Sequence, residues 1–205
     1  MLVFGVVSPH PPIIIPEIGG AEIQKVKKTI SALESAAQAL AEAKPDKLII
    51  IAPHTEHGYE VPLHYLAKYL DPGIELEKIL VTHASYSYYF DLGQKYGELS
   101  ERSEQRIAVI ASGDLSHVLK ADGPYGYHPA GPALDAIIVK AIQEMDVNQL
   151  LTIDREILEY GAECGLRSIL FLFGVFAGKN YSTEVLSYEG PFGVGYMVAT
   201  FAVRQ

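Results

Sequence analysis

The chain has 205 residues, which favours one domain, and 49% of its residues are hydrophobic while only 20% are charged. This composition can bury a sizeable core and excludes disordered, collagen-like and low-complexity chains. The formal net charge is −9 and no block of Lys or Arg occurs. The charge argues against a nucleic acid or a membrane surface as partner, because binding to either needs clustered cations.

The sequence carries no mark of an oxidising compartment or a membrane anchor. Its one cysteine, Cys164, cannot form an intramolecular disulfide. The first residues hold no basic segment ahead of an apolar stretch, and no apolar run reaches the ~20 residues that a membrane span needs. We therefore expect a soluble cytoplasmic protein, and its charge is compatible with pairing into a homo-oligomer.

Predicted strands and helices follow one another along the chain. Short continuous apolar runs closed by turn residues indicate buried strands, and apolar residues at helical spacing indicate amphipathic helices. In chain order we predict a strand over 2–7, a helix over 21–43, a strand over 48–52, a helix over 61–70, a strand over 79–82, a helix over 86–100, a strand over 107–111, helices over 134–145, 147–153 and 166–177, and strands over 184–188 and 196–203.

These elements predict an α/β fold. The first strand, the first long helix and the second strand form a βαβ unit, whose strands lie parallel in one sheet. We expect a single domain over residues 1–205, with a central, mostly parallel sheet and helices on both faces.

Three of the predicted strands are followed within a few residues by a histidine, namely His10, His54 and His117. Ligands of open α/β sheets bind beyond the carboxyl ends of the strands, so these side chains can converge. Imidazole suits iron, zinc or copper, and two histidines with one carboxylate leave coordination positions open. A single turn histidine is more often structural, but three at equivalent strand ends indicate a metal or catalytic site.

The third metal ligand has two candidates at the start of an apolar helix, Glu163 and Cys164. Glu163 would complete a facial triad, whereas Cys164 would make a softer site that suits zinc. Each also has a structural interpretation, Glu163 at a helix N-terminus and Cys164 as a small buried residue. Nearby, His57 can contact a substrate or support a ligand, and Asp114 can orient His117 or cap a turn.

Several motifs together resemble a known family. Residues 8–19, 52–54 and 112–117 resemble the LigB-like class III extradiol ring-cleavage dioxygenases. The glycine-rich segment 188–196 is similar to the Memo-like branch of that superfamily, also known as the AmmeMemoRadiSam system proteins. The resemblance spans nearly the whole chain, and its histidine motifs and glycine-rich segment are jointly specific.

This resemblance implies a non-haem Fe(II) site, with zinc as an alternative in the isolated protein. It implies His10 and His54 as metal ligands and Glu163 as the carboxylate, with Cys164 as the alternative because Memo-like relatives carry a cysteine near that position. His117 would be the acid/base histidine. Residues 56–63 resemble the family's Asp-His-Gly-x-x-Val-Pro-Leu segment, which puts His57 beside the substrate as a second catalytic residue.

The implied reaction is extradiol cleavage of a catechol-type aromatic diol with O2. The alternatives are a Memo-like metal-binding protein without dioxygenase activity and a metal-dependent hydrolase. One departure bears on this choice. Only Thr55 and Glu56 separate His54 from His57, where the family has a long stretch, so the chain resembles a shortened version that lacks the loops walling one side of the pocket.

Overall fold

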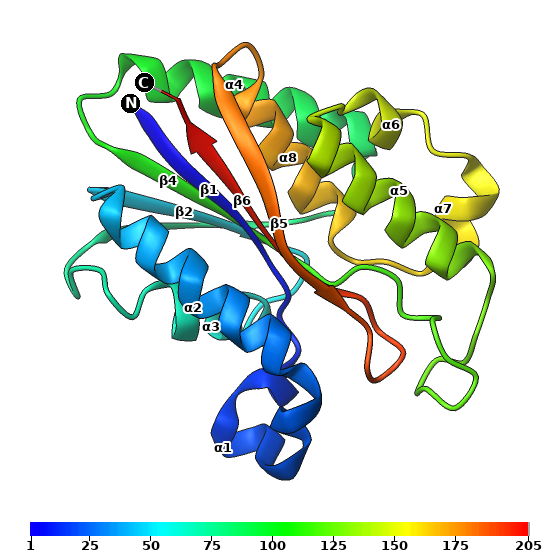
Figure 1. The fold of residues 1–205 in the computed structure, drawn as a ribbon. Helices are drawn as coiled ribbons and strands as arrows, with labels where there is room; N and C mark the ends of the chain where they lie inside the picture. Colours follow the sequence, from blue (N-terminus) through cyan, green and yellow to red (C-terminus); the bar gives the residue numbers. More distant parts are fainter. Residues whose placement is uncertain (205) are drawn as a thin grey trace.

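Six strands form one sheet in the computed structural model, which describes residues 1–204 (Figure 1). The sheet order is β3-β2-β4-β1-β6-β5, and the strands are β1 (Leu2–Ser8), β2 (Lys47–Ala52), β3 (Glu75–Leu80), β4 (Ile107–Ser112), β5 (Tyr181–Glu189) and β6 (Tyr196–Val203). Strands β3, β2, β4 and β1 pair in parallel, whereas β6 is antiparallel to both β1 and β5. The predicted α/β fold with a mostly parallel sheet is confirmed.

A third strand lies between the two strands of the βαβ unit, β1 and β2, which the sequence pattern does not reveal. Both strands lie parallel in the sheet as predicted, but β4 lies between them and pairs with each. Val109 of β4 is opposite Gly5 on one side and Ile49 on the other. All residues of β4 are buried. This strand comes last in sequence among the four parallel strands, yet it lies inside that part of the sheet.

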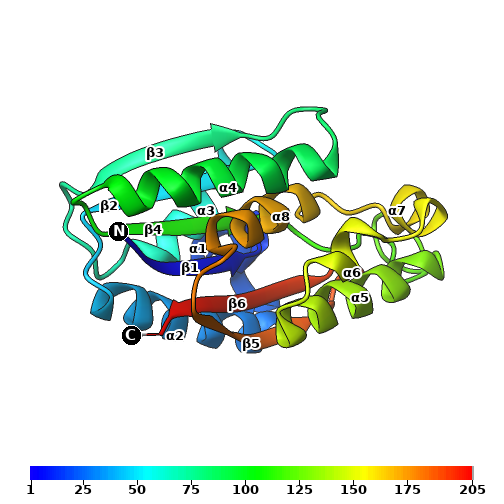
Figure 2. The same cartoon turned by 90° about the horizontal axis from the view of Figure 1, so that it is seen from above.

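Helices cover both faces of the sheet (Figures 1 and 2). The helical segments are η1 (Pro12–Ile14), α1 (Pro16–Gly19), η2 (Gly20–Val26), α2 (Lys27–Glu42), α3 (His57–Leu66), α4 (Tyr86–Arg102), α5 (Ala130–Glu144), α6 (Asn148–Leu151), α7 (Arg155–Gly161) and α8 (Leu166–Phe176). Helices α2 and α3 pack on one face, and α4, α5 and α8 pack on the other. None of the helices among residues 1–204 is both long and apolar enough to cross a membrane.

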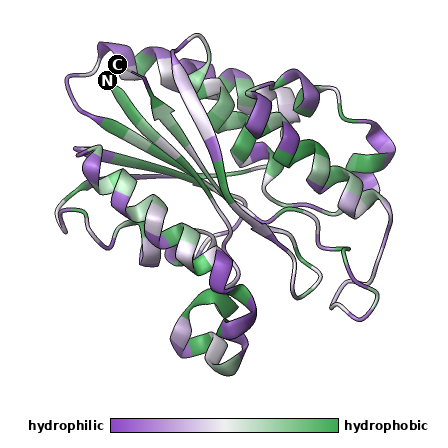
Figure 3. Ribbon diagram, viewed as in Figure 1, coloured by the Kyte–Doolittle hydropathy of each residue, from purple (hydrophilic) through white to green (hydrophobic). Residues whose placement is uncertain are grey.

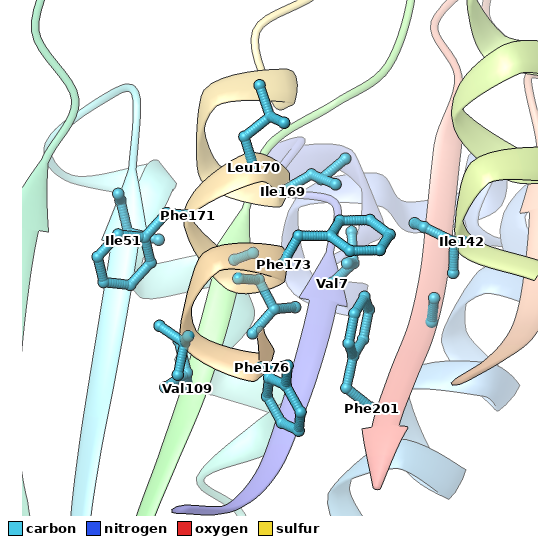
Figure 4. Packing of buried hydrophobic residues seen from close by; sticks show 14 of the residues in the cluster. Val7, Ile51, Val109, Ile142, Ile169, Leu170, Phe171, Phe173, Phe176 and Phe201 are labelled. Carbon is cyan, nitrogen blue, oxygen red and sulfur yellow. The ribbon is translucent and has the colours of Figure 1, made fainter. Parts of the chain in front are cut away.

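Alternating strand residues build a separate core on each face. In β2, Leu48 and Ile50 face the α2 side, while Ile49 and Ile51 face the α8 side. Figure 3 shows these central strands as the hydrophobic interior between helices with polar outer surfaces. On the α8 side, Phe171 packs with the strand residues in the cluster drawn in Figure 4. The predicted helix over 166–177 corresponds to α8. It is apolar on nearly all sides because it is buried.

Some predicted boundaries are wrong at the helix starts. The predicted helix over 21–43 begins as the 3₁₀ segment η2, and its α-helical part starts only at Lys27. The predicted helix over 61–70 starts earlier, at His57, so His57 belongs to the first turn of α3. Pro62 lies inside this helix, where a proline normally favours a boundary, because another group satisfies the carbonyl that it leaves free.

Other predictions are wrong in extent or omit an element. Only the first half of the predicted strand over 79–82 belongs to β3, which starts earlier and ends at Leu80, and the predicted helix over 147–153 shortens to α6. Helix α7, which no apolar spacing revealed, begins at a cap in which the Asp154 carboxylate accepts from the Glu156 N–H at 2.8 Å.

Close contact between α4 and α8 generates a test of the fold. A Cβ at Gly93 would overlap the backbone carbonyl of Phe171. We expect Gly93→Ala to lower the free energy of unfolding by about 1–3 kcal/mol despite the better helix propensity of alanine. Urea denaturation measures the change. Gly73→Ala is the control, because its Cβ would meet only the flexible Asp71 side chain at 3.3 Å, and an equal loss in both variants would contradict the prediction.

Candidate metal centre

Residues after β1 and β2 meet at one edge of the sheet, because both strands are parallel and end there. His10 follows β1, His54 follows β2, and His57 opens α3. Their three rings form a compact triangle with centroid separations of 5.3 Å for His10–His54, 5.4 Å for His10–His57 and 5.3 Å for His54–His57. His10 is buried, whereas His54 is exposed.

Cys164, at the start of α8, joins two of these histidines. Its Sγ lies 3.6 Å from His10 Nε2, and the donor atoms of His10, His54 and Cys164 all lie within 4.8 Å of one another. Metal–nitrogen and metal–sulfur bonds of about 2.1 and 2.3 Å at a tetrahedral angle would place N and S about 3.6 Å apart. The three side chains therefore fit a single metal ion by donor type and by separation.

Glu163 lies in a different environment from its neighbour Cys164. Its carboxylate accepts hydrogen bonds from the Tyr86 hydroxyl at 3.0 Å and from the Leu166 N–H at 2.5 Å. The guanidinium of Arg167 stacks over the Tyr86 ring at 4.3 Å. Burial raises the pKa of Glu163. Of the two predicted third ligands, the structure brings Cys164 to the histidines and uses the Glu163 side chain to cap α8.

A glycine contact holds Cys164 against the loop after β4. The Asp114 N–H donates to Cys164 Sγ at 3.3 Å, and the Cys164 N–H donates to the Asp114 carbonyl at 3.2 Å. The Gly165 N–H shares that carbonyl at 2.9 Å. A Cβ at Gly113 would overlap the Gly165 backbone. Only glycine allows this approach, so the loop and the start of α8 position the thiol together.

The His10 ring is oriented by a chain of hydrogen bonds. Its Nδ1 lies 3.0 Å from Ser112 Oγ, and the Ser112 hydroxyl donates to the Gly58 carbonyl at 2.5 Å. That carbonyl has no helical donor because the residue four positions on, Pro62, has no N–H. With its proton committed to Gly58, Ser112 accepts from Nδ1–H. The unprotonated Nε2 of His10 therefore faces Cys164, as metal ligation requires.

Asp114 supports His10 rather than His117. Its buried carboxylate accepts from the His10 N–H at 3.0 Å, so the expectation that it orients His117 or caps a turn is wrong. Burial raises the pKa of Asp114 to about 7, although the His10 N–H opposes the shift. The carboxyl fixes the backbone of the first metal-ligand candidate from the neighbouring strand.

His117 is held by the turn that precedes Cys164. Its Nδ1 and its backbone N–H both contact the Ala162 carbonyl, at 2.7 and 3.0 Å, so Nδ1 carries the proton and Nε2 is free to accept one. Ala162 takes the left-handed conformation, with φ 50°. The Tyr125 ring meets the His117 ring edge-on at 5.3 Å. Burial lowers the pKa of His117.

The unprotonated form of the histidines is favoured electrostatically. Burial lowers the pKa of His10, and with the smaller effects of the nearby His54, His57 and His117 it brings the value to about 3. Burial and the same neighbours His57 and His117 lower the pKa of His54. Burial and the Asp114 carboxyl raise the pKa of the Cys164 thiol; a bound cation reverses this, because a coordinated thiol is deprotonated.

Three supporting residues had no assigned role in the sequence pattern. Ser112 lay inside a recognised motif without a function of its own, and Pro62 was visible only as part of the Val-Pro-Leu segment. Asp135, on α5, is fully buried and accepts from the Ser116 N–H at 2.8 Å and the Tyr188 hydroxyl at 2.7 Å. It anchors the loop that carries His117. In the sequence, a single aspartate within an amphipathic helix did not indicate this anchoring role.

The Ser112 hydrogen-bond chain generates a prediction. We expect Ser112→Ala to lower metal affinity about 10–100-fold, the usual effect of losing a supporting partner of a histidine ligand. Titration of the metal against a chelator of known affinity measures the change. Ser187→Ala is the matched control, since the Ser187 hydroxyl is buried without a hydrogen-bond partner in the part of the chain described. Unchanged metal affinity in Ser112→Ala would show that this series of hydrogen bonds does not affect metal binding by His10.

Acid should destabilise the metal-free protein through His10. Its pKa is about 3 in the folded chain against an ordinary 6.5, so the unfolded chain binds the proton first. Its contribution to the free energy of unfolding is complete above pH 6.5 and is lost as the pH falls toward 3. Urea denaturation across this range should show a shallower decline for His10→Asn than for wild type, and parallel declines would argue against the assignment.

Comparison with known proteins supports a family assignment. Residues 55–199 match the family described as the catalytic LigB subunit of aromatic ring-opening dioxygenase, a range that includes His57, His117, Glu163 and Cys164 but starts just after His54. Protein CA_C1420 of Clostridium acetobutylicum is 29% identical, over 93% of this chain and 55% of its own length. A MEMO1 family protein of Methanobrevibacter smithii is 27% identical, over 65% of this chain and 44% of its own length.

The chain thus spans about half the length of these curated relatives. Protein JW3007 from Escherichia coli K12 has a solved structure that covers 98% of this chain, and 99% of that chain is matched. The TM-score is 0.62 at 12% sequence identity, a likeness of fold alone. Because the family match covers well over half of the residues, the chain belongs to the LigB family, with a MEMO1 family protein among its relatives.

Proposed function

We propose that this protein is a Memo-like, metal-dependent member of the LigB family in which His10, His54 and Cys164 bind one metal ion. The observation that carries the proposal is the convergence of these three donor atoms within 4.8 Å of one another at the edge of the sheet. Imidazole suits iron, zinc or copper, and the thiolate makes the ligand set softer, which also suits zinc. We propose iron as the native metal, with zinc as the ion that the isolated protein also accepts.

The residues around the three donors support this proposal. Ser112 holds the His10 ring with Nε2 toward Cys164, and Asp114 accepts hydrogen bonds from the backbone N–H groups of both His10 and Cys164. The exposed side chain of His54 leaves the outer side of the ligand set open to solvent. A small molecule that offers oxygen donors can therefore approach from that side, next to His57.

A second candidate is an extradiol dioxygenase acting on a catechol-type diol with O2. The specific support is His117, whose Nδ1 is bonded to the Ala162 carbonyl, which leaves Nε2 free to take a proton from a substrate hydroxyl and return it. An Fe(II) ion held by the ligand set would supply Lewis acidity and sites for the diol and O2. The thiolate in place of the facial-triad carboxylate weighs toward the Memo-like function.

Three accompanying proposals come from the sequence and the family resemblance rather than from the site. We propose that the protein acts in the cytoplasm, takes a small aromatic ligand rather than a nucleic acid or membrane as partner, and self-associates as a homo-oligomer. Light scattering coupled to size-exclusion chromatography measures the last of these.

The ligand set is tested by metal analysis after anaerobic reconstitution with Fe(II) or Zn(II). We expect stoichiometric metal in wild type and in Glu163→Gln, and loss of metal in His10→Ala, His54→Ala and Cys164→Ala. Circular dichroism checks that each variant is folded. Metal retained by Cys164→Ala and lost by Glu163→Gln would reverse the assignment and support a facial triad.

The reaction is tested by oxygen uptake on a panel of catechols that includes protocatechuate. Iron-dependent oxygen consumption with a yellow ring-opened product would establish the dioxygenase, and His117→Ala should then keep its metal and lose turnover. Stoichiometric metal without oxygen uptake supports the Memo-like function. Ester or amide hydrolysis by the zinc form would instead favour a hydrolase.

A further inference from the structure

The loop between β4 and α5 carries the two most exposed tyrosines of residues 1–204. Tyr125 is 64% exposed and Tyr127 is 56% exposed. A single apolar side chain at a surface is ordinary, but two large rings left in water on one loop indicate a surface that another group covers. The neighbours of this loop indicate which group that is.

Backbone contacts hold the loop in a defined position next to the β5–β6 hairpin (Figure 1). Leu119 and Tyr127 form an antiparallel bridge that closes the loop at its base. The Leu119 N–H donates to the Gly193 carbonyl at 3.0 Å. Gly126 has φ 77°, the left-handed conformation that lets the chain turn back after Tyr125. The exposure of the Tyr125 ring is therefore a feature of the fold, since the loop that carries it is fixed by backbone pairing.

Tyr125 is the ring on this loop that meets the candidate site. Its centroid lies 5.3 Å from that of His117, and the two planes make an angle of 77°. His117 is half-buried and its Nδ1 is bonded to the Ala162 carbonyl at 2.7 Å, so Nε2 is the nitrogen that a ligand can reach. A ligand hydroxyl at hydrogen-bond distance from Nε2 lies about 4 Å from the centre of the imidazole ring. A ring attached to that hydroxyl can therefore come within the ~4.5–7 Å over which aromatic rings attract one another.

The contact with His117 leaves much of the Tyr125 ring free. Two rings that meet edge-on cover at most one face of the tyrosine, and 64% of the residue is open to solvent. His128 and Tyr160, by contrast, stack at 4.9 Å and 24°, so each covers a face of the other. Beside the proton acceptor His117, Tyr125 thus keeps an aromatic face on which none of the described residues stacks.

We infer that Tyr125 is a specificity-determining residue that binds the aromatic ring of a ligand whose oxygen atoms face His117 and the metal ion of the candidate centre. His117 and the metal recognise oxygen atoms, which an aliphatic ligand also supplies, whereas Tyr125 recognises a flat ring. The inference rests on the proposed function, because it assigns the ring of the proposed small aromatic ligand to a residue of this chain.

The test uses benzohydroxamate and acetohydroxamate, which chelate a metal through the same pair of oxygen atoms and differ only in a phenyl ring against a methyl group. Calorimetry measures the affinity of each chelator for the metal-loaded wild type and for metal-loaded Tyr125→Ala. We expect Tyr125→Ala to lower the preference for benzohydroxamate about 10-fold, the order expected for one aromatic contact and the apolar area it covers. The affinity for acetohydroxamate and the metal content should stay as in wild type.

Two further variants are matched controls. Tyr125→Phe keeps the ring and should keep the wild-type preference for benzohydroxamate. Tyr127→Ala removes a similarly exposed ring from the same loop, one that does not meet His117 in the described part of the chain, and should also keep that preference. Circular dichroism checks that each variant is folded.

An unchanged ratio of the two affinities in Tyr125→Ala would overturn the inference. Equal weakening of both chelators would overturn it too, because it would indicate that Tyr125 only holds His117 in place. Metal-loaded wild type that binds neither chelator would overturn the inference and leave the metal centre intact. If wild type bound no metal, the proposed function itself would fail, and the inference with it.

Discussion

The candidate site depends on one chain of hydrogen bonds, from His10 through Ser112 to the Gly58 carbonyl. It links the ends of β1 and β4 to the first turn of α3. This series of hydrogen bonds exists because Pro62 has no N–H to donate to the Gly58 carbonyl, which leaves that carbonyl free to accept from Ser112. A proline that would otherwise weaken a helix thus fixes the orientation of the His10 ring, with Nε2 toward Cys164, and the same helix brings His57 beside His10.

The other side of the site is built by contacts between backbones rather than by charges. The loop after β4 and the segment before α8 approach so closely that a Cβ at Gly113 would overlap the Gly165 backbone. This contact places Cys164 near His10, and the turn at Ala162 holds His117. Helix α8 is itself fixed by the apolar core, so the position of the thiol follows from hydrophobic packing. Because burial and the neighbouring rings keep His10 and His54 neutral, the apo site already has its histidines in the protonation state that metal binding needs.

Membership of the LigB family and the geometry of the site both point to metal chemistry, but they favour different reactions. The family match covers His117 and the residues around Cys164, and a relative named for the MEMO1 family lies among the similar proteins. The group that meets His10 and His54 is the Cys164 thiol rather than a carboxylate, and the exposed His54 leaves this cluster open to solvent on one side. The carboxylate of Glu163 instead stabilises the first turn of α8, the helix that follows the thiol.

The sequence by itself determined the α/β class, the buried strands and the histidines at their ends, because apolar periodicity and turn residues are local signals. It also narrowed the third ligand to two adjacent residues. Only the tertiary structure decided which of them meets the histidines, since consecutive side chains point in different directions and the orientation of α8 sets the choice. The position of β4 between β1 and β2 and the hydrogen bond from Ser112 to Gly58 likewise depend on pairings between distant segments. Local propensity cannot report such pairings, because they are stabilised only when the whole sheet and both of its cores have formed.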